Sequence, residues 1–389
     1  MASFLLRITE YEKELKVSWT ISDGDESLGP PAYLINAGLL QQAAANVRKQ
    51  LQVIADARKP FEKLEFAILL KQLAQLGRTL FKQLMSPAND QSEVLQRLFD
   101  ATRNTRQGRQ DFKIILETAE LFVPWGFIFS GELSDVPKKE KLNLSLADMN
   151  GFWLSHFNLS IAYGGTRQLP RRRKTSTRKL FALHEVMFSE ARALLKIEDK
   201  DCHERLEKLL DDNMTPASDW DDFRKVWTEV GSEHDSVLYL YGHSDGQRIE
   251  LRDRSGAGID PTFELSAADL IEFKKDQPGE SAAIFLFNGC RTAAPGSSSV
   301  ELPISANFLK ASQERGYFGF IGTEAEVTNI FACRYGTEFL WRLHEEGRSV
   351  GEAFNELLQS EKLFPQNLLY ACYADRRVRF VTPSAEKRT

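Results

Sequence analysis

Two residues that could act together as nucleophile and base follow two apolar runs of the sequence. Residues 237–246 read VLYLYGHSDG, and residues 284–294 read IFLFNGCRTAA. Each run has the length and composition of a buried strand and stops at a small residue. His243 and Cys290 therefore come just after the carboxyl ends of two predicted parallel strands, the edge at which open α/β sheets bind ligands. We expect the two side chains to form a thiolate–imidazole pair.

The chemistry of such a pair needs both residues. A free thiol has a pKa near ~8.5, so thiolate is scarce at neutral pH unless a nearby imidazolium or backbone N–H groups favour it. Cys290 would attack a carbonyl carbon, and His243 would protonate the leaving amine and later activate water. Gly242 and Gly246 flank the histidine, and Gly289 precedes the cysteine. Glycines allow the close approach of a substrate backbone that a main-chain oxyanion hole requires.

The order of His before Cys, each after an apolar strand, resembles the caspase-like cysteine peptidases, whose signature around the nucleophile is Q-A-C-[RQG]-G. The matching stretch here, at 288–292, reads NGCRT. The chain resembles more closely the CHAT subgroup, bacterial relatives of caspases and separases, in which a strand ending in small-residue-Cys-x-Thr follows a strand ending in a His-Gly turn. Three further stretches resemble that subgroup's third core strand, its late helix start and its Pro-Trp-Glu segment: GYFGFIGT at 316–323, GRSVGEA at 347–353, and VPWG at 123–126 with Gly126 in place of the glutamate.

The resemblance also assigns the groups that stabilise the oxyanion. In caspase relatives a glycine directly follows the histidine, and its N–H serves the oxyanion hole. Here Ser244 and Asp245 intervene before Gly246. The resemblance therefore implies that the main-chain N–H of Ser244 takes this role, with Gly242 and Gly289 beside it.

The remaining cysteines offer no competing site. Cys333 and Cys372 lie in apolar stretches, and Cys202 lies beside His203 in a charged helical segment. An isolated cysteine is more often a small buried hydrophobe than a nucleophile, so the joint placement of His243 and Cys290 carries the assignment. No C-x-x-C pair indicates zinc, and no Gly-rich phosphate loop follows a strand. We expect neither a metal nor a cofactor.

Composition excludes several classes of function. The chain has 389 residues, 42% hydrophobic and 27% charged, enough for a large core and for two domain-sized units. A net charge of −5 argues against a nucleic-acid partner. The sequence shows no apolar run near ~18 residues and no signal-peptide pattern at 1–9, so we expect no membrane partner. Four cysteines form no disulfide framework, which favours a reducing bacterial cytoplasm.

Periodicity divides the chain into two α/β halves joined by a basic linker. Alternating apolar residues at 4–8 and 15–21 predict an antiparallel hairpin, and helical spacing predicts two helices, at 40–54 and 69–84. Strands are expected at 112–116 and 122–129, and His156 is expected inside a strand with the alternating residues 157–163. CHAT modules often hold a degenerate caspase-like half before the active one. By that resemblance we expect residues 1–165 to be a non-catalytic, pseudo-caspase-like half.

Residues 166–180 contain the basic run PRRRKTSTRK. We expect a solvated linker there, because charge runs usually face solvent, while a patch for anionic partners and a cleavage site stay open as alternatives.

Residues 181–389 alternate strands and helices, which predicts a parallel sheet with right-handed crossovers. Strands are expected at 237–241, 284–287 and 317–321, and helices at 182–195, 204–210, 220–230, 266–275, 305–314 and 333–346. Ser266 and Asp269 form a capping-box-like start of the helix between the first two strands. The predicted fold class is α/β: a caspase-like, mainly parallel sheet flanked by helices, preceded by the degenerate half.

The loops near the predicted site contain carboxylates that could select a basic residue before the scissile bond. They are Asp245, Glu301, Glu324 and Glu326, set against Arg248 and Arg291. Because the loop after the third strand would wall the first substrate pocket, we expect Glu324, Glu326 and Asp245 to line it and to select arginine or lysine. Loop carboxylates often only face solvent. In that case the alternative is a substrate with aspartate before the scissile bond, bound by Arg248 and Arg291.

Two function classes stay open. One is a cysteine endopeptidase, a regulated bacterial effector that cleaves a protein partner and that a protein activator or sensor controls, as CHAT enzymes do in defence and signalling systems. The other is a catalytically silent caspase-like module that only binds a partner. Intact His243 and Cys290 favour the first, and the altered turn at Ser244 and Asp245 favours the second. A nucleotide-binding α/β protein finds no support.

Overall fold

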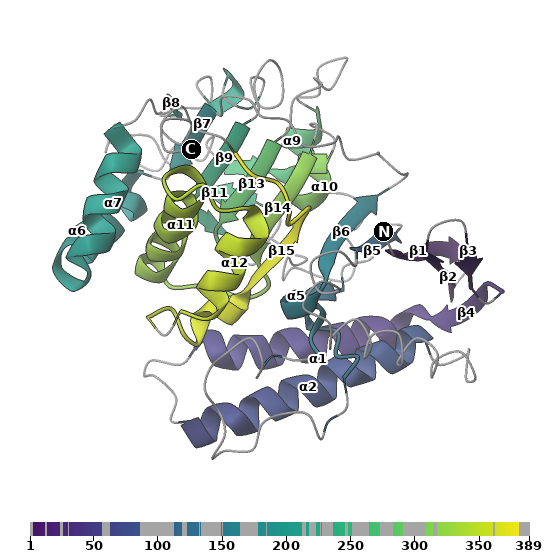
Figure 1. The fold of residues 1–389 in the computed structure, drawn as a ribbon. Helices are drawn as coiled ribbons and strands as arrows, with labels where there is room; N and C mark the ends of the chain where they lie inside the picture. Colours follow the sequence, from purple (N-terminus) through teal and green to yellow (C-terminus); the bar gives the residue numbers. More distant parts are fainter. Residues whose placement is uncertain are drawn as a thin grey trace. The chain divides into compact units, whose positions relative to one another are not determined.

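The structure, a computed structural model, falls into two compact units: Met1–Gln168 with Leu358–Arg376, and Leu169–Leu357 with Arg377–Thr389 (Figure 1). It describes residues 3–11, 14–23, 26–29, 31–56, 63–85, 113–118, 123–131, 133, 149, 151–163, 178–183, 185–211, 215–217, 223–225, 227, 236–245, 248–250, 264–272, 283–290, 308–313, 317–360 and 362–380.

The sheet of the first unit is mixed. Its strands lie in the order β3-β2-β1-β5-β6, with β4 also on β2: β1 (Ser3–Tyr11), β2 (Glu14–Asp23), β3 (Glu26–Leu28), β4 (Tyr33–Asn36), β5 (Lys113–Thr118) and β6 (Asn158–Tyr163). β1 and β2 pair antiparallel, which confirms the predicted hairpin, whereas β1, β5 and β6 run parallel. Phe4, Leu6 and Ile8 alternate into the core, as the period of two requires.

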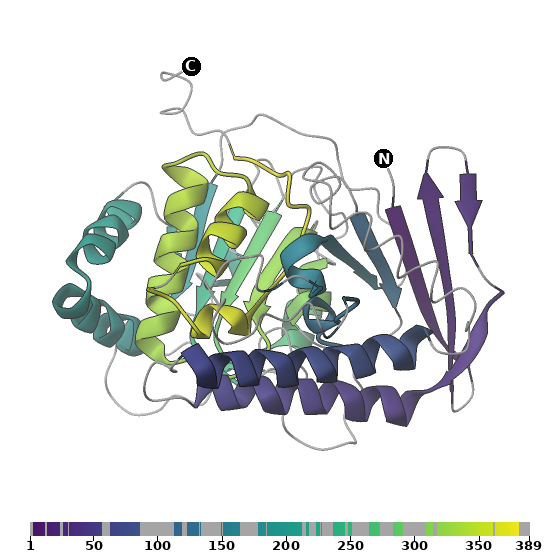
Figure 2. The same ribbon diagram turned by 60° about the horizontal axis from the view of Figure 1, so that its bottom comes forward.

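Two long helices of this unit, α1 (Ala37–Ala55) and α2 (Lys63–Met85), lie side by side (Figure 2). Asn36 caps α1, because its Oδ1 accepts a hydrogen bond from the Leu39 N–H at 3.0 Å. The residues that predicted α1 by their spacing lie on its buried face, including Leu40, Val47 and Leu51. Both predicted helices are confirmed.

Two assignments in this unit were wrong. Residues 122–129 were expected to form a strand, but Trp125–Phe127 form the 3₁₀ helix η1, closed by the Phe127 N–H on the Pro124 carbonyl at 2.8 Å. His156 was expected inside a strand, but it ends the short helix α5 (Trp153–His156). The segment Trp125–Phe127 is buried, and α5 begins with the buried apolar residues Trp153 and Leu154; short apolar runs do not distinguish a strand from a buried turn.

The C-terminal segment Leu358–Arg376 belongs to the first unit and includes η5 (Gln366–Leu369) and the fully buried strand β15 (Tyr370–Ala374). Asn158 ties it to β6. The Asn158 amide donates to Asp375 Oδ1 at 3.2 Å and accepts from the Arg376 N–H at 3.1 Å. The division expected from the sequence, into 1–165, 166–180 and 181–389, separates the halves only at the linker. It therefore assigns Leu358–Arg376 to the second half, whereas this segment belongs to the first unit.

The second unit contains the parallel sheet that the sequence predicted. Its strands lie in the order β14-β13-β9-β7-β8 with neighbours paired parallel: β7 (Arg178–Leu183), β8 (Thr215–Ala217), β9 (Ser236–Tyr241), β13 (Ala283–Asn288) and β14 (Tyr317–Thr323). Every residue of β9 is buried, which is typical of a strand covered by helices on both faces. This architecture confirms the α/β fold class.

One helix start was placed too early. The sequence predicted a helix from Ala182, but Arg178–Leu183 form β7, and α6 (Glu185–Glu198) begins after it. β7 pairs along its whole length with β9. These ladder hydrogen bonds override the helical spacing of the isolated segment, because tertiary context outweighs local propensity. The strand also occupies the last residues of the segment expected to be a linker.

Helices cover both faces of this sheet (Figure 1). Phe287 of β13 packs edge-to-face on Phe308 of α10 (Phe308–Gln313) at 5.3 Å. The next residue, Asn288, donates through its side chain to the Ala332 carbonyl of α11 (Asn329–His344). Because neighbouring side chains of a strand point to opposite faces, α10 and α11 lie on opposite sides of the sheet.

The described part of the second unit also contains α7 (Lys200–Asp211), α9 (Ala267–Glu272) and α12 (Val350–Leu358). The predicted cap of α9 is confirmed: the Asp269 N–H donates to Ser266 Oγ at 3.1 Å, and Ser266 N–H donates to Asp269 Oδ2 at 2.9 Å. Of the helix expected at 220–230, most lies outside the described residues, and 223–225 and 227 are helical.

Candidate active site

The register of the sheet places His243 and Cys290 at equivalent positions on neighbouring strands. β9 and β13 pair in parallel up to Tyr241 and Asn288, and the Gly242 N–H continues the ladder to the Asn288 carbonyl at 3.4 Å. His243 lies two residues after Tyr241, and Cys290 lies two residues after Asn288, the last pair of the two strands. Adjacent strands lie ~4.8 Å apart, so the two residues leave one sheet edge about one strand spacing from each other.

Cys290 differs from the other cysteines in its exposure. All four cysteines lie among the described residues and are free thiols, and Cys202, Cys333 and Cys372 are buried whereas Cys290 is partly exposed. The Cys290 thiol donates to the Val327 carbonyl, with sulfur and oxygen 3.7 Å apart. Val327 lies in the loop between β14 and α11. Of the four cysteines, Cys290 is the one that is not buried.

His243 leaves the main sheet and begins a small antiparallel one. It lies in β10 (His243–Ser244), which pairs with β11 (Arg248–Glu250), and β11 pairs with β12 (Glu264–Ser266). The imidazole is exposed. Its cross-strand neighbour is Glu250, and directly opposite residues of an antiparallel pair have Cβ atoms ~4.5–5.5 Å apart. A carboxylate is therefore positioned beside the histidine.

The pairing of β10 with β11 extends to Asp245 and Arg248. Asp245 accepts the Arg248 N–H on its side-chain oxygen at 2.8 Å, and the Asp245 N–H donates to the Arg248 carbonyl at 3.3 Å. Paired residues of antiparallel strands alternate between hydrogen-bonded and non-hydrogen-bonded pairs. Since Asp245 and Arg248 are a bonded pair, the backbone N–H of Ser244 points away from β11.

The acidic residues expected around the first substrate pocket have three different environments. Asp245 pairs with Arg248, as described above. Glu324 follows β14 directly and is only 1% exposed, whereas Glu326 two residues later is exposed. Glu301 lies outside the described residues. Glu324 and Glu326 thus lie on the loop whose Val327 carbonyl accepts the Cys290 thiol. The carboxylate of Asp245 is already hydrogen-bonded to the Arg248 N–H.

Buried polar side chains that the sequence analysis did not select hold the strand ends. Asn288, two residues before the cysteine, donates to the Tyr239 hydroxyl at 2.9 Å and to the Ala332 carbonyl. The Thr323 hydroxyl at the end of β14 donates to the Gly289 carbonyl. Their signal in the sequence is a polar residue that ends an otherwise apolar strand, since a buried polar group needs a partner.

A second set of contacts fixes the start of α11 near the same edge. The Tyr241 hydroxyl donates to the Asn329 carbonyl at 2.8 Å, and the Asn329 amide donates to the Met187 carbonyl of α6 at 2.8 Å. The loop that contains Val327 directly precedes Asn329. The β9 strand, α6 and the loop that accepts the Cys290 thiol are thus joined by hydrogen bonds.

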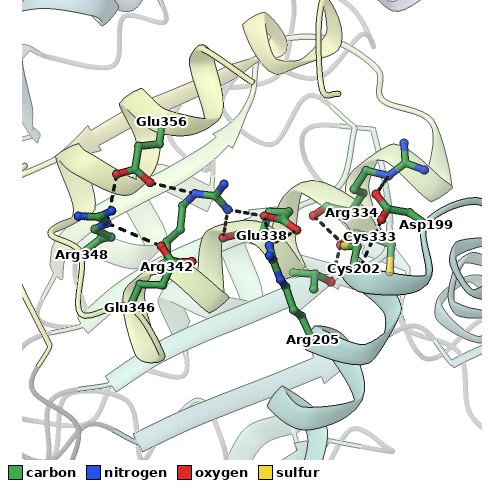
Figure 3. A network of polar contacts seen from close by, with 11 residues as sticks. Asp199, Cys202, Arg205, Cys333, Arg334, Glu338, Arg342, Glu346, Arg348 and Glu356 are labelled. Carbon is green, nitrogen blue, oxygen red and sulfur yellow. Dashed lines mark hydrogen bonds and ion pairs between the residues drawn. The ribbon is translucent and has the colours of Figure 1, made fainter. Parts of the chain in front are cut away.

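Farther from this edge, α7 and α11 are joined by a network of ion pairs (Figure 3). Glu338 accepts from Arg205 at 2.8 Å and from Arg342, and Glu356 accepts from Arg342 at 3.2 Å and from Arg348 at 3.1 Å. Every charge named here is paired, so the network stabilises the helix packing and offers no ligand site.

Three thiols are unsuited to nucleophilic attack. Burial raises the pKa of Cys333 from 9.0 to about 12 and that of Cys372 from 9.0 to about 11. Burial, with the nearby carboxylates of Glu338 and Asp199, raises the pKa of Cys202 further. Desolvation disfavours the charged thiolate, and the thiolate is the nucleophilic form.

The described part of the chain contains no group of three or more histidine, cysteine, aspartate or glutamate side chains arranged to hold a metal ion. None of its helices combines the length and the apolar character that crossing a membrane requires.

Comparison with known proteins gives a fold. No protein-family model matches the sequence, and no curated protein sequence matches it. Among solved structures, the chain is similar to a chain in the crystal structure of the Saccharomyces cerevisiae separase–securin complex at 3.0 Å resolution, with a TM-score of 0.50 and 10% identity. A second structure of that complex, at 2.6 Å, gives a TM-score of 0.48 and 11% identity. Both similarities cover 97% of this chain and 30% of the other.

The first of these similarities shows the fold alone. The chain has a mixed α/β, caspase-like fold of the kind found in separase, with sheets flanked by helices. It spans about a third of the length of the chain it resembles, as the 30% coverage states. The expected caspase and separase relationship is confirmed at the level of fold, and the CHAT subgroup stays a prediction.

Proposed function

We propose that this protein is a cysteine endopeptidase of the CHAT and caspase-like type, with Cys290 as nucleophile and His243 as general acid and base. The observation that carries the proposal is the shared register: both residues follow two positions after the last pair of adjacent parallel strands, at the sheet edge where α/β folds place ligand sites. The partial exposure of Cys290, beside three buried thiols with raised pKa values, supports the choice of nucleophile.

The proposed reaction proceeds in two steps. The Cys290 sulfur bonds to the substrate carbonyl carbon while the π-electron pair moves to the oxygen. When the C–N bond breaks, the leaving amine takes a proton from His243, and a thioester stays on the enzyme. Water then gives a proton to His243 and attacks the thioester, and the sulfur leaves as thiolate. Main-chain N–H groups at Ser244 and Cys290 would stabilise the oxyanion of each step, with Gly242 and Gly289 leaving room for the substrate.

The substrate class proposed is a protein segment with arginine or lysine before the scissile bond. Glu326 is exposed on the loop that contacts the Cys290 thiol and is the first candidate for this pocket, whereas Glu324 on the same loop is only 1% exposed. A charge-assisted bidentate contact with a guanidinium contributes ~1.5–3 kcal/mol, which corresponds to roughly a ten- to hundredfold preference for arginyl over aspartyl reporters. Asp245 is the weaker candidate for this pocket, because its carboxylate accepts a hydrogen bond from the Arg248 N–H.

The proposal extends to the biological setting. The similar structure is that of a separase–securin complex. By analogy we propose a protein substrate and a protein activator or sensor as partners, and neither nucleic acid nor membrane lipid. The first unit, by resemblance to the degenerate half of CHAT modules, would act as a non-catalytic scaffold. Free cysteines favour a reducing bacterial cytoplasm.

The test is steady-state hydrolysis of a fluorogenic peptide panel that varies the residue before the scissile bond. Cys290→Ala and His243→Ala should each abolish cleavage, within an order of magnitude of each other, because the two residues act as a unit. Cys372→Ala, which removes a buried thiol of the other unit, is the matched control and should keep activity. Cleavage that survives Cys290→Ala would refute the assignment.

The alternative is a caspase-like module that binds a partner without catalysis. The observation that favours it is the exposed His243 with two residues, Ser244 and Asp245, before the next glycine. A correctly folded wild-type protein that cleaves no peptide of the panel would support this reading.

A further inference from the structure

We infer that Thr323 is a positioning residue that orients the backbone N–H of Cys290 toward the substrate carbonyl. The inference rests on the proposed function and deepens it, because it adds a residue from a third strand to the site. The observation behind it is the hydrogen bond from the Thr323 hydroxyl to the carbonyl of Gly289, the residue directly before the nucleophile.

The geometry of the peptide bond connects this contact to catalysis. The bond between Gly289 and Cys290 is planar and trans, so its C=O and its N–H point in opposite directions. The strands lie in the order β14-β13-β9, and Thr323 is the last residue of β14. A Gly289 carbonyl directed at β14 therefore directs the Cys290 N–H toward β9, the strand that His243 follows.

The pairing of the preceding residue agrees with this direction. The Asn288 carbonyl accepts the Gly242 N–H of the β9 segment at 3.4 Å, and carbonyls of successive residues in a strand alternate sides. The hydrogen bond from the Thr323 hydroxyl places the Gly289 carbonyl on the opposite side, toward β14. The contact thus fixes the direction of this carbonyl beyond the end of β13, where Gly289 lies in a bend and Cys290 in a turn.

Thr323 is suited to hold this orientation. It is 0% exposed, so water does not compete for the Gly289 carbonyl from its side. It precedes Glu324, Ala325 and Glu326, which form the loop expected to wall the substrate pocket. One residue thus connects the predicted pocket loop to the peptide that supplies an oxyanion donor.

The test compares two reactions of the same thiol in the full chain. Peptide hydrolysis passes through an oxyanion, whereas alkylation of Cys290 by iodoacetamide does not. Thr323→Val keeps the shape of the side chain and removes the donor, and it should lower kcat roughly 10- to 100-fold, somewhat less than the loss of an oxyanion donor itself. The alkylation rate of Cys290 should stay within about threefold of wild type.

Two control variants separate positioning from a structural role. Thr323→Ser keeps the hydroxyl and should restore kcat to within about threefold of wild type. Thr337→Val removes a buried hydroxyl of the same kind, which donates to the Cys333 carbonyl at 2.8 Å within α11, and should leave kcat unchanged.

The outcomes distinguish this inference from the proposed function. A wild-type protein without Cys290-dependent hydrolysis would refute the proposed function. Hydrolysis by wild type that Thr323→Val leaves unchanged would refute the inference alone. An equal loss of hydrolysis and of alkylation in Thr323→Val would show that the residue acts only on local structure, and would also refute it.

Discussion

Replacing Gly336 by alanine should destabilise the second unit although alanine is the better helix former. Gly336 lies in α11, and a Cβ atom there would stand 2.4 Å from the hydroxyl of Tyr239, 2.7 Å from its Cζ and 2.8 Å from its Cε2. The Tyr239 ring is 1% exposed, packs edge-to-face on Phe181 at 5.7 Å, and its hydroxyl accepts from Asn288 at 2.9 Å. The ring therefore has little room to yield.

The magnitudes decide the sign. The substitution gains ~1 kcal/mol of helix propensity. Overpacking a filled core costs ~1–3 kcal/mol, and displacing the Tyr239 hydroxyl from Asn288 costs a further ~1 kcal/mol. We expect Gly336→Ala to lower the free energy of unfolding by ~1–3 kcal/mol.

The assay is urea unfolding of the wild type, both single variants and the double variant with Tyr239→Phe. Tyr239→Phe removes the atom nearest to the new methyl group, so the double variant should be more stable than the sum of the single effects by ~1 kcal/mol, a coupling typical of residues in contact. A Gly336→Ala variant that is more stable than wild type would refute the packing argument, because helix propensity would then outweigh the predicted clash.

Further predictions concern a helix cap, the ion pairs and the thiols. Ser349→Ala should cost ~1 kcal/mol in urea unfolding, since Ser349 and Glu352 exchange hydrogen bonds at the start of α12 as a capping box does; an unchanged midpoint would contradict the cap. Glu338→Gln should lower the thermal midpoint more in low salt than in 1 M salt, because it removes a charge that pairs two arginines and salt screens such pairs; a salt-independent effect would show that packing dominates. Burial raises the pKa of Cys333 and Cys372 above 9.0, so the stability that their protonated thiols contribute is present below about pH 9 and falls as pH rises toward 11 to 12. Cys372→Ala should therefore make the fall in the urea midpoint between pH 8 and pH 10.5 less steep than in the wild type. An equal slope in the two proteins would contradict the burial effect.

The sequence predicted the central features of the fold because their patterns are local and strong. The alternation of Phe4, Leu6 and Ile8 identifies β1, and the apolar runs before Gly242 and Gly289 identify β9 and β13. Parallel order follows from the alternation of strands and helices. The positions of His243 and Cys290 in the chain were therefore visible before the register was known.

The errors occurred where tertiary contacts outweigh the local pattern. Residues 178–183 form a strand because β9 supplies their hydrogen bonds, which no spacing within the segment reveals. The turn at Trp125–Phe127 is buried on all sides and so carries no period. The return of Leu358–Arg376 to the first unit depends on the Asn158 contacts, which join residues far apart in the sequence.

The sequence identified His243 and Cys290 as the candidate pair, but not the residues that hold the strand ends beside them. Asn288, Thr323 and Tyr239 are ordinary residues in a strand, and their importance comes from the partners that the fold supplies. Of the residues expected in the pocket, Asp245 was selected for its charge alone. In the structure its carboxylate accepts a hydrogen bond from the Arg248 N–H instead.

The central claim, that Cys290 is a nucleophile served by His243, is tested most directly by covalent labelling with a peptidyl acyloxymethyl ketone that has arginine at the position before the reactive group. Such a reagent alkylates a thiol efficiently only when the enzyme binds it as a substrate and activates the sulfur. Peptide mapping by mass spectrometry should find the adduct on Cys290 in the wild type and should find labelling at least roughly tenfold slower in His243→Ala, since a thiol without its base keeps little reactivity. An adduct on Cys202, Cys333 or Cys372, or labelling of Cys290 at the same rate without His243, would contradict the account.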